Sequence, residues 1–280
     1  MRPDATRRRN SGSRNSGSRD SRPRPGFTLV ELLTVIGLIA LLLSLFMPVL
    51  GKVRAAANTT GCVSNLRQVG VAWTMYVAEN HGRLPDFTGT VAATPDVAWR
   101  GYWPGIAQTA GVKGESLLCP AARTTSDLPH GYGNVSDAWN GKGINNGGTY
   151  RMTDQTARVS SYGYNRHLTS GSRVVDDGAV VSLNALQDPA NVPAFLDCAH
   201  PDARPASRGP NIPEASPPNL SGEGLNEASP GHWRFLLGRH GRGINVYMAD
   251  GSARWVRLED TYLLTWKPGW MPYRLRLPAQ

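Results

Sequence analysis

The sequence predicts an α+β fold in which a long N-terminal helix packs on an antiparallel, β-rich globular head. Three observations lead to this prediction. An apolar run without an ionisable residue extends from Leu32 to Leu50, and a helical apolar stripe continues from Val63 to Val77. After residue 83, short apolar runs alternate with Gly, Pro, Asn and Thr. That last pattern is typical of strands joined by turns and long loops.

The apolar run is long enough to cross a membrane as a helix. Residues 32–50 at about 1.5 Å each span about 28 Å, close to the roughly 30 Å hydrocarbon core of a bilayer. A secretory signal peptide has a shorter apolar core and a small-residue cleavage site, which Ala55–Ala57 only approaches. A plain anchor would have no use for Glu31, because a carboxylate near the bilayer centre costs about 2.5–3.5 kcal/mol. We therefore expect a membrane-inserted helix whose Glu31 has a cationic partner.

Beyond Leu50 the helix is expected to continue to Asn80 as an amphipathic segment. Apolar residues recur at spacings of three and four, at Val63, Leu66, Gly70, Trp73 and Val77. Asn80-His81-Gly82 supplies a stop, with Pro85 close behind. Pro48 and Gly61 are expected points of bending. Residues 27–50 would thus form the membrane half of the helix, and residues 51–82 the half that packs under the head.

Residues 83–280 are expected to form the head. Short apolar runs predict strands at Val174–Val175, Ala179–Leu183 and Val192–Leu196, while Val91–Trp99 and Tyr102-Trp103 are weakly defined. The segment Asp202–Pro230 is rich in Pro, Ser, Gly and Asn, and we expect an exposed insertion loop there.

The clearest hairpin involves Ile244–Ala249 and Ser252–Leu258, which flank Asp250-Gly251. Asp-Gly between alternating apolar runs predicts a type I′ turn, which needs positive φ at both central residues. A histidine and a carboxylate such as His240 and Asp250 can act as base and orienter or as metal ligands. Because the turn already explains Asp250 and Gly251, we expect all three residues to be structural, with His240 bridging the loop before the strand.

Three cysteines in an oxidising compartment predict one disulfide and one leftover thiol. The sequence allows three pairings, of which we favour Cys62 with Cys119, because it would staple the helix to the head. The cysteines have no close spacing, so no metal site is expected. Asp176-Asp177-Gly178 is interpreted as a turn rather than a calcium loop, and no cofactor is expected.

The charge is concentrated at the N-terminus. Residues 1–26 contain eight arginines and two aspartates, so they carry +6 of the formal net charge of +9. The high pI of the chain is therefore little evidence for nucleic-acid binding. Arginines beside the membrane run favour a cytoplasmic N-terminus.

The pairs Trp99 and Trp103, or Trp266 and Trp270, would either form a sugar-binding platform or, as we prefer, fill the core.

Gly26-Phe27-Thr28-Leu29-Val30-Glu31 resembles the processing and methylation motif of type IV prepilins and type II secretion pseudopilins. The resemblance implies that a membrane peptidase cuts after Gly26, removing residues 1–26 as a leader, and methylates Phe27. It implies that Glu31 is an assembly residue. His240, nine residues before Asp250-Gly251, resembles the H-x9-DG region at the C-terminus of many prepilin-like proteins, in the hairpin region 240–258.

The resemblance implies a structural subunit that assembles through its helix into a pilus or type II secretion pseudopilus, and the large head favours a minor or specialised one. Its expected partners are a prepilin peptidase and methyltransferase, other pilin-like subunits, an inner-membrane assembly platform and membrane lipid. It would be a single-pass inner-membrane protein with an extracytoplasmic head, and not an enzyme. The alternative is an anchored head that binds a ligand, such as polysaccharide, or acts as an adhesin. An enzyme on the same anchor ranks third, and no nucleic acid is expected.

Overall fold

The structure is a computed structural model that describes residues 27–85, 102–124, 132–139, 159–170, 180–205, 217, 219–226 and 229–278. The chain divides into two compact units, Met1–Leu50 and Gly51–Gln280, which are described separately. Four sequence expectations lie outside the described residues, namely those on Gly26, Val91–Trp99, Val174–Val175 and Asp176-Asp177-Gly178.

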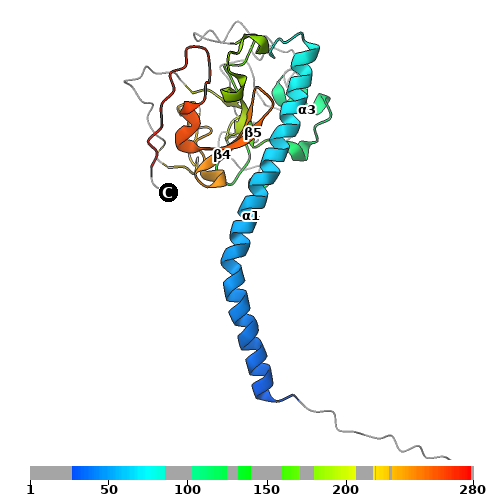
Figure 1. Ribbon diagram of the computed structural model, residues 1–280, viewed down its shortest axis with the longest axis vertical. Coiled ribbons are helices and arrows are strands. Elements are labelled where there is room, and N and C mark those ends of the chain that lie inside the picture. Colours follow the sequence, from blue (N-terminus) through cyan, green and yellow to red (C-terminus); the bar gives the residue numbers. More distant parts are fainter. Residues whose placement is uncertain are drawn as a thin grey trace, which may run out of the picture. The chain divides into compact units, whose positions relative to one another are not determined.

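Helix α1, Leu29–Glu79, confirms the predicted helix and continues through Pro48 and Gly61 (Figure 1). By length and composition it is able to span a membrane, and none of its most apolar stretch is buried in the structure. The helix begins with a capping box. The amide of Glu31 donates to Oγ1 of Thr28 at 3.2 Å, and the Glu31 carboxylate accepts the Thr28 amide at 2.9 Å.

The second half of α1 buries the predicted face within the Gly51–Gln280 unit. Its buried residues are Cys62, Leu66, Val69, Gly70, Ala72, Trp73 and Val77, which include four of the five residues of the predicted stripe. The predicted stop is confirmed. His81 and Gly82 have φ values of 55° and 83°, and the Gly82 amide donates to the Val77 carbonyl at 2.8 Å. These two residues turn the chain out of the helix.

The head contains a five-stranded sheet in the order β3-β1-β2-β4-β5. The strands are β1 Tyr162–Asn165, β2 Pro193–Asp197, β3 Asp202–Ala203, β4 Gly243–Met248 and β5 Ala253–Arg257. Three neighbouring pairs are antiparallel, as predicted, but β1 and β3 are parallel, so the sheet is mixed. Strand β3 also begins the segment that the sequence predicted as a loop. Its two residues are too few to give a strand pattern in the sequence.

The β4–β5 hairpin is confirmed, with Tyr247 opposite Ala253, but its turn differs from the prediction. Among the described non-glycine residues only His81 has a positive φ, so Asp250 lacks the φ that a type I′ turn requires, whereas Gly251 has a φ of 93°. The result is a three-residue loop, closed by the bond from the Met248 amide to the Ser252 carbonyl at 2.8 Å. Three-residue hairpin loops place a glycine at this left-handed position.

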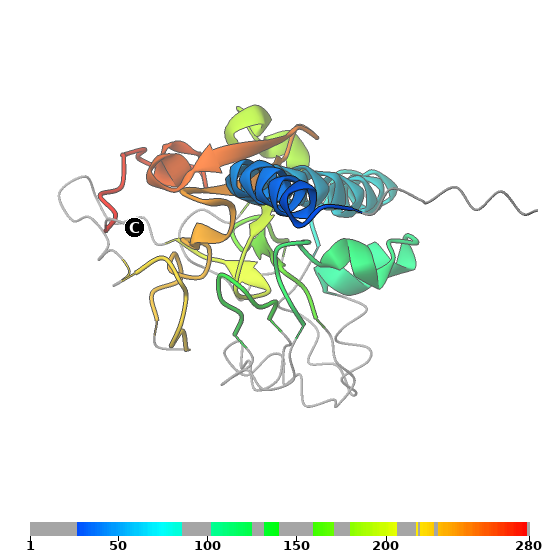
Figure 2. The same cartoon turned by 90° about the horizontal axis from the view of Figure 1, so that it is seen from below.

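The core covers both faces of the sheet, since successive strand residues point to opposite sides. On one face Tyr247 and Phe195 pack with α1 and with α3, Trp103–Thr109, which lies beside α1 in Figures 1 and 2. On the other face Val246 and Met248 pack with the C-terminal segment, which includes the 3₁₀ helix η6, Leu258–Leu263. Both faces of β4 are therefore buried.

Helix α1 approaches β4 so closely at Gly70 that a side chain has no room. A Cβ there would lie 2.2 Å from the Tyr247 ring, whereas a Cβ at Gly51 would meet nothing within 4 Å. We expect Gly70→Val to destabilise the head by about 1–3 kcal/mol, because overpacking forces the helix or the ring to move. Thermal unfolding of the detergent-extracted chain checks this, with Gly51→Val as the matched control. Equal midpoints for the two variants would contradict the close packing of α1 on β4.

A cluster of buried charges joins β1, β3 and the loop that holds Arg234. The Asp202 carboxylate pairs with Arg166 at 3.1 Å, with Nδ1 of His200 at 2.5 Å, and with Arg234. Burial raises the pKa of Asp202, but the charges of His200 and Arg234 outweigh it and hold that pKa well below its usual range. The carboxylate is therefore ionised, and it fixes the short parallel strand β3 beside β1.

Candidate metal centre

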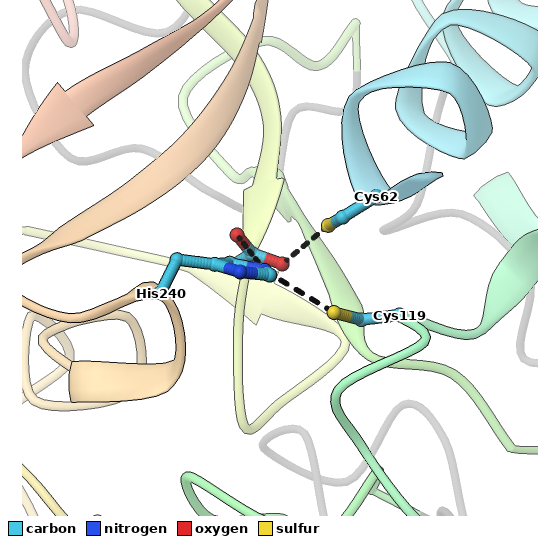
Figure 3. A group of neighbouring side chains, drawn as sticks. Cys62, Cys119 and His240 are labelled. Atoms are coloured by element: carbon cyan, nitrogen blue, oxygen red, sulfur yellow. Dashed lines mark hydrogen bonds and ion pairs between the residues drawn. The ribbon is translucent and has the colours of Figure 1, made fainter. Parts of the chain in front are cut away.

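Four residues distant in sequence meet inside the head. Cys62 lies on α1, and Cys119 follows the 3₁₀ helix η1, Gly114–Leu117. Asp197 ends β2, and His240 ends the 3₁₀ helix η5, Gly238–His240, just before β4. Their sulfur, carboxylate oxygen and imidazole nitrogen atoms all lie within 4.8 Å of one another. Figure 3 shows the side chains of Cys62, Cys119 and His240 converging from three separate segments. These four residues are called the Cys₂AspHis cluster below.

The contacts within the cluster form a chain from one sulfur to the other. The Cys62 thiol donates to Oδ1 of Asp197 at 3.0 Å, and Nε2 of His240 lies 3.4 Å from Oδ2 of Asp197. The same Nε2 lies 3.2 Å from the Cys119 sulfur. The side chains of His240 and Asp197 are 1% and 0% exposed, and both cysteines are buried. The cluster is therefore closed to solvent.

Thr59, one turn before Cys62 on α1, fixes the orientation of the His240 ring. Its hydroxyl donates to the Ala55 carbonyl at 3.0 Å, so its one hydrogen is used there. Oγ1 of Thr59 lies 3.1 Å from Nδ1 of His240 and must therefore accept the Nδ1 hydrogen. Nε2, the nitrogen facing Cys119 and Asp197, is therefore the one that carries the lone pair whenever the imidazole is neutral.

Asp197 is held by two groups outside the cluster. The backbone N–H of Asn245, the third residue of β4, donates to its Oδ2 at 2.7 Å. The buried Arg239 guanidinium lies 4.0 Å from its Oδ1. Arg239 is itself fixed by backbone carbonyls, including those of Val135 and Ser161 at 3.2 and 2.9 Å. The carboxylate therefore has a fixed position and a compensating positive charge.

The cluster shifts the pKa values of its members. Interaction with Cys62 lowers the pKa of Cys119 to about 6 against the effect of burial, and the bond to His240 adds to this. Burial raises the pKa of Cys62 well above its usual value. Burial lowers the pKa of His240, but Asp197 and Cys119 outweigh it and raise the value to about 9. At neutral pH these shifts favour a Cys119 thiolate beside a His240 imidazolium.

Three kinds of chemistry use such residues. In a cysteine–histidine–carboxylate triad the cysteine is accessible to substrate. The cysteine contacts one ring nitrogen of the histidine, and the carboxylate contacts the other. Here Cys119 is fully buried, and Asp197 lies on the same nitrogen as Cys119, so the geometry is not that of a triad. A disulfide would join the two sulfurs. A divalent metal would use all four side chains, since thiolate, imidazole and carboxylate are the ligands of zinc.

The structure brings together some of the residues singled out in the sequence and separates others. It places the Cys62 and Cys119 sulfurs in one cluster as free thiols, so the disulfide stays a prediction. His240 contacts Asp197 rather than bridging its own loop as predicted. The Asp250 carboxylate instead accepts the Ser252 amide and hydroxyl in the hairpin turn. Sequence reasoning missed Thr59 and Asp197, which no motif marks.

The described residues of the segment that resembles the processing motif belong to the other unit, Met1–Leu50. Phe27 is 85% exposed and directly precedes Thr28, the N-cap of α1, while Glu31 lies in the first turn.

Cys198, the third cysteine, is buried, and burial raises the pKa of its thiol to about 12. Its sulfur contacts the Asp202 carbonyl at 3.7 Å, so it belongs to the structure around β3.

The described tryptophans of the two candidate sugar platforms are buried. Trp103, Trp266 and Trp270 are at most 8% exposed, and each indole donates to a backbone carbonyl. Trp99 lies outside the described residues. These three residues therefore belong to the core.

No protein-family model, curated protein or solved structure matches the chain.

Proposed function

We propose that this chain is a prepilin-like structural subunit, cut after Gly26 and methylated on Phe27. The observation that carries the proposal is the start of α1. A helix with a membrane-length apolar stretch begins two residues after Phe27, and its first turn carries the carboxylate of Glu31. The segment Gly26–Glu31 resembles the prepilin processing motif, and that resemblance is specific.

Physical chemistry supports an assembly role for this segment. Cleavage after Gly26 leaves a cationic amine on Phe27, at one end of an apolar helix. In a fibre, Glu31 of one subunit pairs with the Phe27 amine of a neighbour. Each charge alone is costly in an apolar environment, and the pair removes much of that cost. Pairing therefore sets the axial register between subunits.

The head supports a structural role over ligand binding. A binding head should expose a cluster of aromatic side chains, whereas the tryptophans named above are buried and hydrogen-bonded. On this proposal the chain is a single-pass inner-membrane protein with a cytoplasmic N-terminus and an extracytoplasmic head, without enzymatic activity. Its partners are the prepilin peptidase and methyltransferase, other pilin-like subunits, the assembly platform and lipid.

The proposal is tested by Gly26→Ala in cells that contain a prepilin peptidase. The wild-type chain is expected to lose its 26-residue leader, and the variant to keep it, because the peptidase needs glycine before the cut. Gel mobility and immunoblotting of membrane fractions separate the two forms. Gly37→Ala is the matched control, since a Cβ there meets nothing within 4 Å. Equal mobility of wild type and Gly26→Ala would overturn the proposal.

A further inference from the structure

We infer that the Cys₂AspHis cluster is a structural zinc site that fastens α1 to the head. Four ligand atoms from four separate segments lie within 4.8 Å of one another, and none of the four residues belongs to the processing or assembly segment. The inference therefore stands independently of the proposed function.

The spacing of the ligand atoms fits a tetrahedral zinc ion. Zinc lies about 2.3 Å from a thiolate sulfur and about 2.0–2.2 Å from nitrogen or oxygen, which places tetrahedral ligand atoms about 3.3–3.8 Å apart. The distances found here are 3.0 Å from the Cys62 sulfur to Oδ1 of Asp197, 3.2 Å from the Cys119 sulfur to Nε2 of His240 and 3.4 Å from that nitrogen to Oδ2 of Asp197. Each distance is within about half an ångström of the tetrahedral spacing, and Asp197 presents one carboxylate oxygen to Cys62 and the other to His240.

The surroundings of the cluster supply the second shell that metal-binding histidines and carboxylates require. A ligating histidine donates its other N–H to a fixed acceptor, which sets the tautomer and the ring orientation. Thr59 is that acceptor, and its own hydrogen is committed to Ala55, so Nε2 is the free ligand atom. The Asn245 amide likewise orients the Asp197 carboxylate. These contacts have no purpose for a disulfide, which uses neither His240 nor Asp197.

Charge and burial indicate a divalent ion in a structural site. Two thiolates and a carboxylate around Zn²⁺ leave one negative charge, which the buried Arg239 balances at 4.0 Å from Asp197. Four protein ligands in a closed, buried position are typical of structural zinc, whereas catalytic zinc keeps a position open. Mixed sulfur and nitrogen ligands also select zinc over magnesium or calcium, which prefer oxygen.

The test is zinc analysis of the full-length chain, extracted from membranes in detergent and purified with a reductant and without an affinity metal. We expect about one zinc per chain, the stoichiometry of a single four-ligand site. Zinc should be lost in Cys62→Ser and in His240→Gln. Cys198→Ser should keep it, because that thiol is equally buried but lies outside the cluster. Cobalt added after chelation should give the visible and thiolate charge-transfer bands of a tetrahedral sulfur site.

Thr59→Val separates a metal site from the other readings of the cluster. It keeps the shape of the side chain and all four ligands but removes the acceptor for His240, so zinc affinity should fall about 10–100-fold. A disulfide between Cys62 and Cys119 would be unaffected by it. A wild-type chain that neither contains nor takes up zinc would overturn the inference, as would a Cys62–Cys119 disulfide in metal-free chain extracted without reductant. Zinc retained equally in His240→Gln would do the same.

Discussion

Glu31→Gln is expected to abolish assembly while leaving processing after Gly26 intact. An uncharged side chain cannot pair with the Phe27 amine of a neighbour, and that amine is then left unpaired in an apolar interface. Removing one partner of a buried ion pair costs roughly 3–5 kcal/mol, which is more than a hundredfold in an association constant. Chemical cross-linking in membranes and the shear-released fraction measure assembly.

The capping box gives Glu31 a role in starting the helix, and the choice of variant separates this role from the proposed role in assembly. Glutamine also serves at this position of a capping box, so Glu31→Gln keeps the helix start and removes only the charge. Thr28→Ala does the reverse, because it removes the hydroxyl that accepts the Glu31 amide and keeps the carboxylate. We expect Thr28→Ala to assemble. Assembly of Glu31→Gln at the wild-type level would show that Glu31 only caps the helix.

Asp202→Asn is expected to destabilise the head by about 3–5 kcal/mol at pH 7, because it removes the buried carboxylate that pairs with the partly buried Arg166 and Arg234. Asp188→Asn is the control, since Asp188 is exposed and should change stability by no more than about 0.5 kcal/mol. Thermal unfolding of both variants in detergent checks the difference. Similar losses in the two variants would contradict a structural role for the buried cluster.

The stability difference between wild type and Asp202→Asn should depend on pH, because Asp202 titrates. The pKa of Asp202 is lower in the folded state than in the unfolded state, where it is near 4. The ionised carboxylate therefore contributes fully to the free energy of unfolding above about pH 4, and this contribution is lost as the pH falls further. The stability gap between wild type and Asp202→Asn should therefore narrow below about pH 4, by about 1.4 kcal/mol per pH unit. A gap that is constant from pH 7 to pH 3 would contradict the lowered pKa.

The sequence predicted the features that depend on local pattern. The run from Leu32 to Leu50, the stripe from Val63 to Val77 and the stop at Gly82 predicted α1 nearly to its ends, because helical periodicity lies within one segment. Alternating apolar residues around Asp250-Gly251 likewise predicted the β4–β5 pairing. The turn type was wrong because φ at Asp250 follows from loop length, which the dipeptide alone does not fix.

The candidate site could be predicted only in fragments. Cys62, Cys119 and His240 carry metal-binding side chains, but a metal site shows in a sequence only as closely spaced ligands, and neighbouring members of this cluster lie more than 40 positions apart. The expectation of no metal site rested on that spacing alone. The cluster depends on α1, β2 and η5 packing together, which is a property of non-local contacts. Asp197 gave no signal because it simply ends an apolar strand.

The mature chain is proposed to begin at Phe27, and the intact mass of the membrane-extracted wild-type protein tests this start most directly. We predict a mass equal to residues 27–280 plus one methyl group, with N-terminal fragment ions that place the methyl on Phe27. A chain that still contains residues 1–26 would make this a plain anchored head. A chain cut near Ala57 would make it a secreted one, and either result would contradict the prepilin-like assignment.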